Sequence, residues 1–126
     1  MSGGEKSRRL GGWGEELAAR FLEERGWQIL ARNWRCRYGE VDLIASDGRY
    51  LAFVEVKLRN SDRYGQPMEA VTAAKQRRLL TAAQLYLAEH PTALQPRFDV
   101  AQVFAPGGME PGLARIEYVE NAFEGE

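Results

Sequence analysis

The sequence has almost none of the residues that build disulfides and cysteine-based zinc sites. Cys36 is the single cysteine and His90 is the single histidine. An internal disulfide needs two cysteines, and a structural zinc site needs several cysteines or histidines, so both are excluded within one chain. A metal site in this chain would have to use oxygen ligands, which suit the hard cations magnesium and manganese.

Long apolar runs are also missing. No segment approaches the roughly 20 apolar residues that a membrane-spanning helix needs, and the N-terminal MSGGEKSRRLGG lacks the apolar core of a secretory signal. We therefore expect a cytoplasmic protein with no membrane partner. A chain of 126 residues predicts one compact domain. We place it at residues 10–123, between a flexible N-terminus at residues 1–9 and a tail at residues 124–126.

A strong excess of one charge is absent as well. The net charge is −1 at pH 7, whereas proteins that coat duplex nucleic acid without specificity are strongly basic. The charges are unevenly placed along the chain. Residues 1–39 carry eight basic and five acidic side chains, whereas residues 101–126 carry one basic and five acidic side chains. Any nucleic-acid site must therefore be a local patch.

Hydrophobic periodicity predicts an α/β domain. Apolar residues at three- and four-residue steps predict a helix over residues 10–25, which Gly26 ends. A second helix is predicted from either Met68 or Thr72 to Glu89, because both starts have suitable capping signals. Strands are predicted at residues 27–34, 40–46, 49–59 and 97–105, with an edge strand at 114–120. The intervening helix favours a parallel crossover between the third and fourth strands, and the third strand is predicted to be central.

The segment GEVDLIASDGRYLAFVEVKLR, residues 39–59, places charged side chains in an otherwise apolar hairpin. Buried charge is unfavourable unless it is paired or binds a metal. Asp47-Gly48 is typical of a two-residue turn, and such a turn would set Asp42 opposite Phe53.

In that register four charged side chains share one face of the sheet, since residues two apart on a strand point the same way. They are Glu40, Asp42, Glu55 and Lys57. Asp42 and Glu55 are then diagonal neighbours whose side chains can converge on one cation. Several acids gathered on one face therefore predict a site for magnesium or manganese, with Lys57 beside it.

Longer motifs resemble a known family. The stretches LGGWGEELAARFL, ARNWRCRYGEVDLI, FVEVKLR, YGQPMEAVTAAKQRRL, RFDV and NAF resemble the YraN family of bacterial proteins, which has no settled function. Asp42 followed by Glu55-Val56-Lys57 resembles the PD-(D/E)XK nuclease superfamily, and more distantly the archaeal Holliday junction resolvases. This resemblance implies a restriction endonuclease-like core, ordered helix, three strands, helix, strand, with a mixed central sheet flanked by helices.

The resemblance also implies roles for individual residues. Asp42 and Glu55 would be metal ligands, Glu15 on the first helix would complete the metal site, and Lys57 would be the catalytic lysine. The sequence departs from the superfamily at one position: Val41 occupies the place of the proline that gives the superfamily its name.

The implied activity is a magnesium- or manganese-dependent nuclease that hydrolyses DNA phosphodiester bonds, with branched DNA in repair or recombination as one substrate. DNA is the implied partner, and a homodimer is implied by analogy with resolvases. The alternative is a non-catalytic nucleic-acid-binding or scaffold module that retains the nuclease fold.

Some site residues keep two interpretations. Glu40 is either an outer acid near the metal or a charge at the strand entry, and Glu15 is either a ligand or a solvated helix residue. Lys75, Arg59 and Arg37 are either phosphate-binding groups or ordinary surface charges. The remaining polar residues near Lys75 are interpreted as a solvated helix face: Gln76, Arg77 and Arg78.

Overall fold

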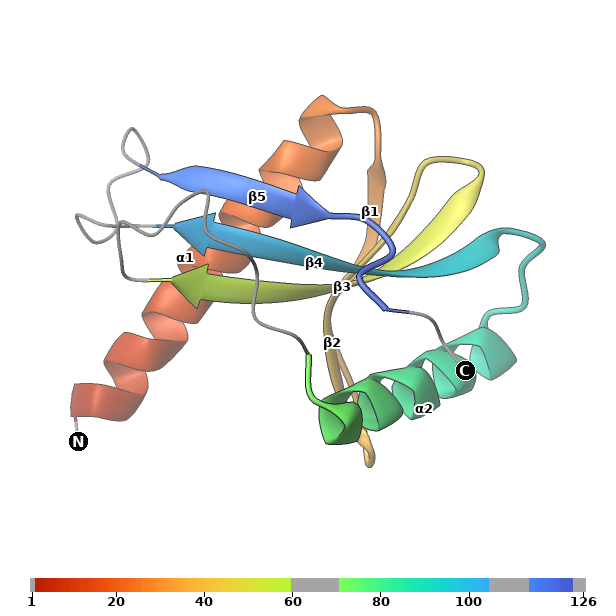
Figure 1. Ribbon diagram of the computed structural model, residues 1–126, viewed down its shortest axis with the longest axis horizontal. Coiled ribbons are helices and arrows are strands. Elements are labelled where there is room, and N and C mark those ends of the chain that lie inside the picture. Colours follow the sequence, from red (N-terminus) through yellow and green to blue (C-terminus); the bar gives the residue numbers. More distant parts are fainter. Residues whose placement is uncertain (1, 60–70, 105–113, 124–126) are drawn as a thin grey trace.

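The computed structural model describes residues 2–59, 71–104 and 114–123, with side chains from Gly12 onward (Figure 1). The elements are α1 (Ser2–Glu24), β1 (Gln28–Cys36), β2 (Gly39–Ser46), β3 (Tyr50–Arg59), α2 (Ala73–Glu89), β4 (Gln95–Phe104) and β5 (Arg115–Val119). All predicted helices and strands are present, and the α/β class is confirmed.

Both helices end where local sequence signals place an end, but α1 begins earlier than predicted. It starts at Ser2 rather than Leu10. Glu5, Lys6, Arg8 and Arg9 have good helix propensity, whereas Gly3 and Gly4 do not. The backbone of residues 2–9 is helical where we expected a flexible N-terminus. For α2, Thr72 is the N-cap, and its hydroxyl accepts a hydrogen bond from the Lys75 backbone N–H at 3.2 Å. The alternative start, Met68, lies outside the described residues.

A five-stranded mixed sheet lies between the two helices (Figure 1), as predicted. Its order is β1-β2-β3-β4-β5, and every neighbouring pair is antiparallel except the parallel pair β3–β4. The predictions of a central third strand, a parallel crossover and a C-terminal edge strand are confirmed. In the described part of the chain, neither helix is long and apolar enough to cross a membrane.

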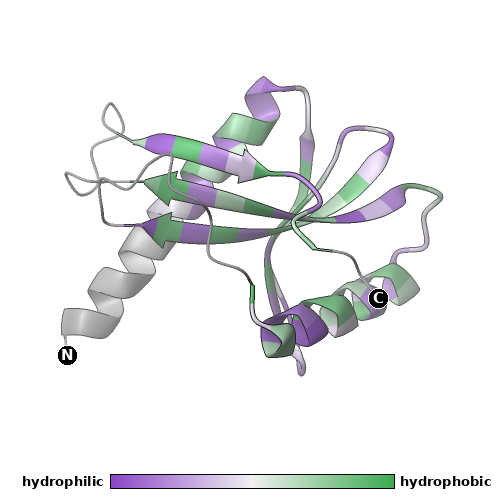
Figure 2. Cartoon of the chain, viewed as in Figure 1, coloured by the Kyte–Doolittle hydropathy of each residue, from purple (hydrophilic) through white to green (hydrophobic). Residues whose placement is uncertain are grey.

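Each face of the sheet carries its own apolar layer. The layer under α1 is formed mainly by Ala18, Leu22, Leu43, Val54 and Ala101. The layer under α2 is formed mainly by Val41, Phe53, Leu79, Tyr86 and Phe98. Figure 2 shows hydrophilic positions among the hydrophobic ones on β3 and β4. Residues 51–55 of β3 and 98–104 of β4 are nevertheless buried at every position, in keeping with strands covered on both faces.

The β2–β3 register differs from the prediction by two residues. Ser46 pairs with Leu51, so four residues form the connection instead of two. The Asp47 carboxylate accepts hydrogen bonds from the backbone N–H groups of residues 49 and 50 at 2.9 and 2.7 Å, and this side-chain-bridged turn replaces the expected tight one. Since the shift is even, Glu55 and Lys57 keep their predicted common face of β3. Strand β2 does not alternate regularly at Asp42, because Val41 packs in the layer under α2 and Leu43 in the layer under α1.

The β1–β2 hairpin separates from β3 on the side of α2. The last β2–β3 backbone pair is Leu43 with Val54. Strand β1 carries a bulge between Ile29 and Ala31, and Asn33 has a left-handed φ of 51°. Bulges increase strand twist, so the end of this hairpin can bend away from the central strands. The separation creates the space that the candidate site occupies.

Candidate acidic functional site

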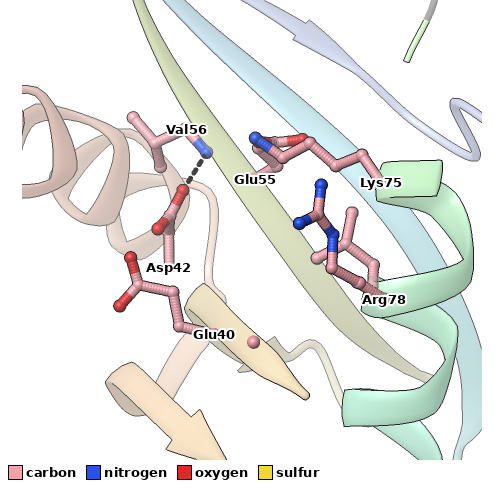
Figure 3. A pocket seen from close by; sticks show the side chains of 8 residues that line it. Glu40, Asp42, Glu55, Val56, Lys75 and Arg78 are labelled. Carbon is pink, nitrogen blue, oxygen red and sulfur yellow. Dashed lines mark hydrogen bonds and ion pairs between the residues drawn. The ribbon is translucent and has the colours of Figure 1, made fainter. Parts of the chain in front are cut away.

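A pocket of about 360 Å³ lies between the end of β2, the middle of β3 and the first turns of α2. Figure 3 shows its side chains, which come from all three elements. It is lined by Gly39, Glu40, Asp42, Glu55, Val56, Lys75, Arg78 and Leu79. The structure thus brings three of the predicted acids together with Lys75 in one cavity.

Glu55 is the most buried charged side chain in this pocket. Its neighbours Val54 and Val56 face the α1 layer, so strand alternation directs Glu55 toward α2. The side chain is only 7% exposed, and one carboxylate oxygen forms an ion pair with Lys75 Nζ. The other oxygen, Oε2, is buried without a hydrogen-bond partner among the described residues. A buried carboxylate oxygen without a partner is costly, and it marks a position where a ligand can bind.

Asp42 holds β2 against β3 where the backbone pairing ends. Its Oδ2 accepts a hydrogen bond from the Val56 backbone N–H at 2.8 Å. The pKa of Asp42 is raised to about 6, mainly by burial and also by the negative charges of Glu15, Glu55 and Glu40, against the opposing effect of that hydrogen bond. A divalent cation bound here would relieve this repulsion.

Glu15 reaches the same acidic region from α1. Burial raises its pKa, a side-chain hydrogen bond with Asn33 lowers it, and the charge of Glu40 raises it. Glu15 does not line the pocket itself. It nevertheless acts electrostatically on Asp42, so the three acids predicted as metal ligands lie in one charged region.

The carboxylates do not form a ready-made metal cage. Among the described residues no three acidic, histidine or cysteine side chains are arranged to hold a metal ion. Figure 3 shows Asp42 turned toward Val56 and Glu55 turned toward Lys75. Magnesium commonly uses only one or two protein carboxylates and keeps water or substrate oxygens as its other ligands. Asp42 and Glu55 Oε2, which has no hydrogen-bond partner within residues 2–59, 71–104 and 114–123, fit that smaller ligand set.

Three other predicted residues do not line the pocket: Lys57, Arg59 and Arg37. Lys57 follows Glu55 by two positions on β3, so it shares that face of the strand and lies beside Gln102 of β4. Arg59 Nε donates a hydrogen bond to Gln102 Oε1 at 3.3 Å. Glu40, which lines the pocket, also forms an exposed ion pair with Arg35 at 2.9 Å, and both of its interpretations stay open.

Sequence reasoning missed Arg78, which lines the pocket one helical turn after Lys75. The signal was available, because residues three apart on a helix share one face. Lys75 was predicted as either a phosphate-binding group or a surface charge, and the structure places it as the partner of Glu55.

The fold and the pocket define an α/β protein with a mixed sheet and a buried acidic site. The profile of the uncharacterised protein family UPF0102 matches residues 14–103, and the chain belongs to this family. A UPF0102 protein of Symbiobacterium thermophilum is 55% identical over 118 residues, covering 93% of this chain and 98% of that protein. A UPF0102 protein of Nocardia farcinica is 51% identical over 111 residues, covering 87% of each chain. The predicted membership of an uncharacterised bacterial family is confirmed.

Proposed function

We propose that this protein is a magnesium- or manganese-dependent nuclease that hydrolyses phosphodiester bonds in DNA. The observation that carries the proposal is Glu55, a buried carboxylate with one oxygen that has no hydrogen-bond partner in the described part of the chain, beside Asp42 in a pocket that also presents cationic side chains. The PD-(D/E)XK resemblance, with its restriction endonuclease-like core and distant similarity to resolvases, supports the same assignment.

In this proposal Asp42 and Glu55 hold the cation, and Glu15 adds negative charge that strengthens cation binding. The bound cation would neutralise charge on the phosphate and polarise it toward attack by water. Lys57 projects from the same face of β3 as Glu55 and can donate a hydrogen bond to a phosphate oxygen as negative charge develops there. Arg78 supplies a fixed positive charge at the α2 wall of the pocket.

Lys75 has two positions in this scheme. Without a divalent cation, its ammonium neutralises Glu55. Its side chain is 47% exposed, so it can turn toward solvent when the cation binds Glu55. It is then free to contact a phosphate at the pocket mouth.

A second function is favoured by one observation. The ammonium of Lys75 already neutralises Glu55, and the described residues lack a three-ligand metal arrangement. A protein with such a pocket could bind nucleic acid without cleaving it, as a module that retains the fold and has no catalytic step.

The test compares cleavage and binding in the same variants. We expect wild-type protein to cleave labelled branched, single-stranded or duplex DNA with magnesium or manganese, and Glu55→Gln and Lys57→Ala each to lose about 100-fold or more in single-turnover rate. Glu89→Gln, an exposed charge near the end of α2, is the matched control and should cleave normally. Cleavage that survives unchanged in Glu55→Gln contradicts the proposal, whereas DNA binding with no cleavage under any metal favours the binding module.

A further inference from the structure

A second hollow adjoins the acidic pocket. It has a volume of about 350 Å³ and lies between the β1–β2 turn and the outer face of α2. Its lining residues are Tyr38, Ala74, Arg77, Arg78 and Thr81, and we call it the Tyr38 cleft. Arg78 lines both the cleft and the acidic pocket, so the two spaces are adjacent along α2.

Positive charge is concentrated around the Tyr38 cleft without acidic partners. Arg37, Arg77 and Arg78 are exposed, and none of them has a carboxylate partner among residues 2–59, 71–104 and 114–123 whose side chains are described. Other arginines of the same regions are paired, as Arg32 is with Glu16 and Arg35 is with Glu40. Three unpaired guanidinium groups around one hollow favour an anionic ligand.

An exposed aromatic ring completes the cleft. Tyr38 is 41% exposed and is one of only two large hydrophobic side chains that are exposed in the described part of the chain; the other is Leu30. The Arg37 guanidinium carbon lies 5.1 Å from the centre of the Tyr38 ring. A ring flanked by a guanidinium is an arrangement suited to stacking a planar group such as a nucleobase.

We infer that the Tyr38 cleft binds an unpaired nucleotide of a single nucleic-acid strand whose neighbouring phosphate enters the acidic pocket. The base stacks on Tyr38, and Arg77 and Arg78 contact the phosphates that lead to the pocket. The base must be unpaired, because the faces of bases in a duplex are covered by their neighbours. Stacking is tolerant of sequence, since every base has a π face. This inference rests on the proposed function and adds its substrate class: single strands, or frayed and flapped ends of branched DNA.

The experiment measures binding without cleavage. A short fluorescein-labelled oligothymidylate and a blunt duplex are titrated in calcium buffer, with fluorescence anisotropy as the readout. We expect Tyr38→Ala to weaken single-strand binding by about 5-fold to 100-fold and Tyr38→Phe to stay within about twofold, because stacking needs the ring and not the hydroxyl. Leu30→Ala is the matched control, since it removes a similarly exposed apolar side chain from the same hairpin.

The salt dependence of the binding affinity distinguishes the contribution of charge from that of stacking. Arg77→Gln should reduce the slope of affinity against salt concentration by about one unit, whereas Tyr38→Ala should leave that slope unchanged. If Tyr38→Ala binds the single strand as Leu30→Ala does, or loses duplex binding equally, the cleft is only a charged patch and the inference is overturned.

The outcomes distinguish this inference from the proposed function. Metal-dependent cleavage that requires Glu55 and does not change in Tyr38→Ala contradicts the proposed role of the cleft and supports the proposed nuclease activity. Single-strand binding that depends on Tyr38, with no cleavage under any metal, contradicts the proposed nuclease activity and supports the proposed role of the cleft. If wild-type protein binds no oligonucleotide at all, the cleft proposal is overturned. A calorimetric manganese titration of wild type against Glu55→Gln then still tests the acidic pocket.

Discussion

Two buried carboxylates lie on neighbouring central strands and have opposite surroundings. Asp99 of β4 is 1% exposed, and Glu55 of β3 is 6% exposed. The oxygens of Asp99 accept hydrogen bonds from Arg97 Nε at 2.9 Å, the Tyr118 hydroxyl at 2.6 Å and the Asn121 backbone N–H at 2.8 Å. Glu55 has one half-exposed lysine partner and one oxygen without a partner among the described residues.

The partners of Asp99 are themselves fixed by their neighbours. The Arg97 guanidinium lies 4.6 Å from the ring of Tyr50 and 5.3 Å from that of Trp27. Burial raises the pKa of the Tyr118 hydroxyl, and the adjacent Asp99 charge raises it further, so Tyr118 stays a hydrogen-bond donor. A closed network of this kind links β4, β5 and the segment after β5. A buried acid whose oxygens all have partners stabilises the fold. A buried acid with one oxygen that lacks a partner among the described residues, as in Glu55, is a candidate ligand site.

The largest expected effect is on Asp99. Asp99→Asn removes the charge that neutralises buried Arg97 and should lower the free energy of unfolding by about 3 kcal/mol. Urea unfolding followed by circular dichroism measures this loss. Tyr118→Phe, which deletes one hydrogen bond of the same network, should cost only about 1 kcal/mol. Equal free energies of unfolding for Asp99→Asn and wild type would show that the network does not stabilise the fold.

The next effect is a pH dependence that comes from Asp42. Its carboxyl has a pKa of about 6 in the folded protein, against about 3.9 when unfolded. Between these values the folded state binds more protons, so the contribution of Asp42 to stability is largest below about pH 4 and is lost as the pH rises through about 6, by about 3 kcal/mol.

Asp42→Asn provides the matched control, because other carboxyls titrate equally in both proteins. Wild type should lose stability relative to Asp42→Asn between acidic and neutral pH, and magnesium should reduce that loss. A difference between the two proteins that is constant with pH would show that Asp42 titrates normally.

Glu55→Gln should change stability far less than Asp99→Asn does. The substitution removes a buried charge together with its desolvation cost, and the half-exposed Lys75 regains contact with water. The free energy of unfolding in chelator-treated buffer should therefore stay within about 1 kcal/mol of wild type. A loss as large as that of Asp99→Asn would place Glu55 among the structural acids and weaken its assignment as a ligand.

The smallest effect is expected at Lys75. Lys75→Met removes the ammonium that competes for Glu55 and should tighten manganese binding about threefold in a calorimetric titration, as suits a partly exposed ion pair. Arg77→Met removes the same charge from α2 without touching Glu55 and should leave the affinity closer to wild type. Identical affinities in the two variants would mean that only the net charge of α2 matters.

Local sequence signals predicted most of the fold because the elements obey short-range rules. Gly26 follows the end of α1 with a φ of 88°, as the sequence predicted. The β2–β3 register was wrong because Asp47 bridges its turn with its own carboxylate, an option that a turn dipeptide alone does not reveal. Tyr38 and Arg78 were missed because they line one cleft only when the β1–β2 hairpin packs beside α2, which the sequence alone does not reveal.

Periodicity and spacing in the sequence by themselves determined the α/β class, the central position of β3 and the common face of Glu55 and Lys57. Those properties follow from strand alternation and helical repeat, which act over a few residues. Only the tertiary structure decided which carboxylate is satisfied and which is not. Lys75 lies 20 positions after Glu55 and Tyr118 lies 19 after Asp99, so their pairing depends on how α2 and β5 pack against the sheet. Ligand-binding potential is set by such long-range contacts, because they fix the partners that each buried oxygen has or lacks.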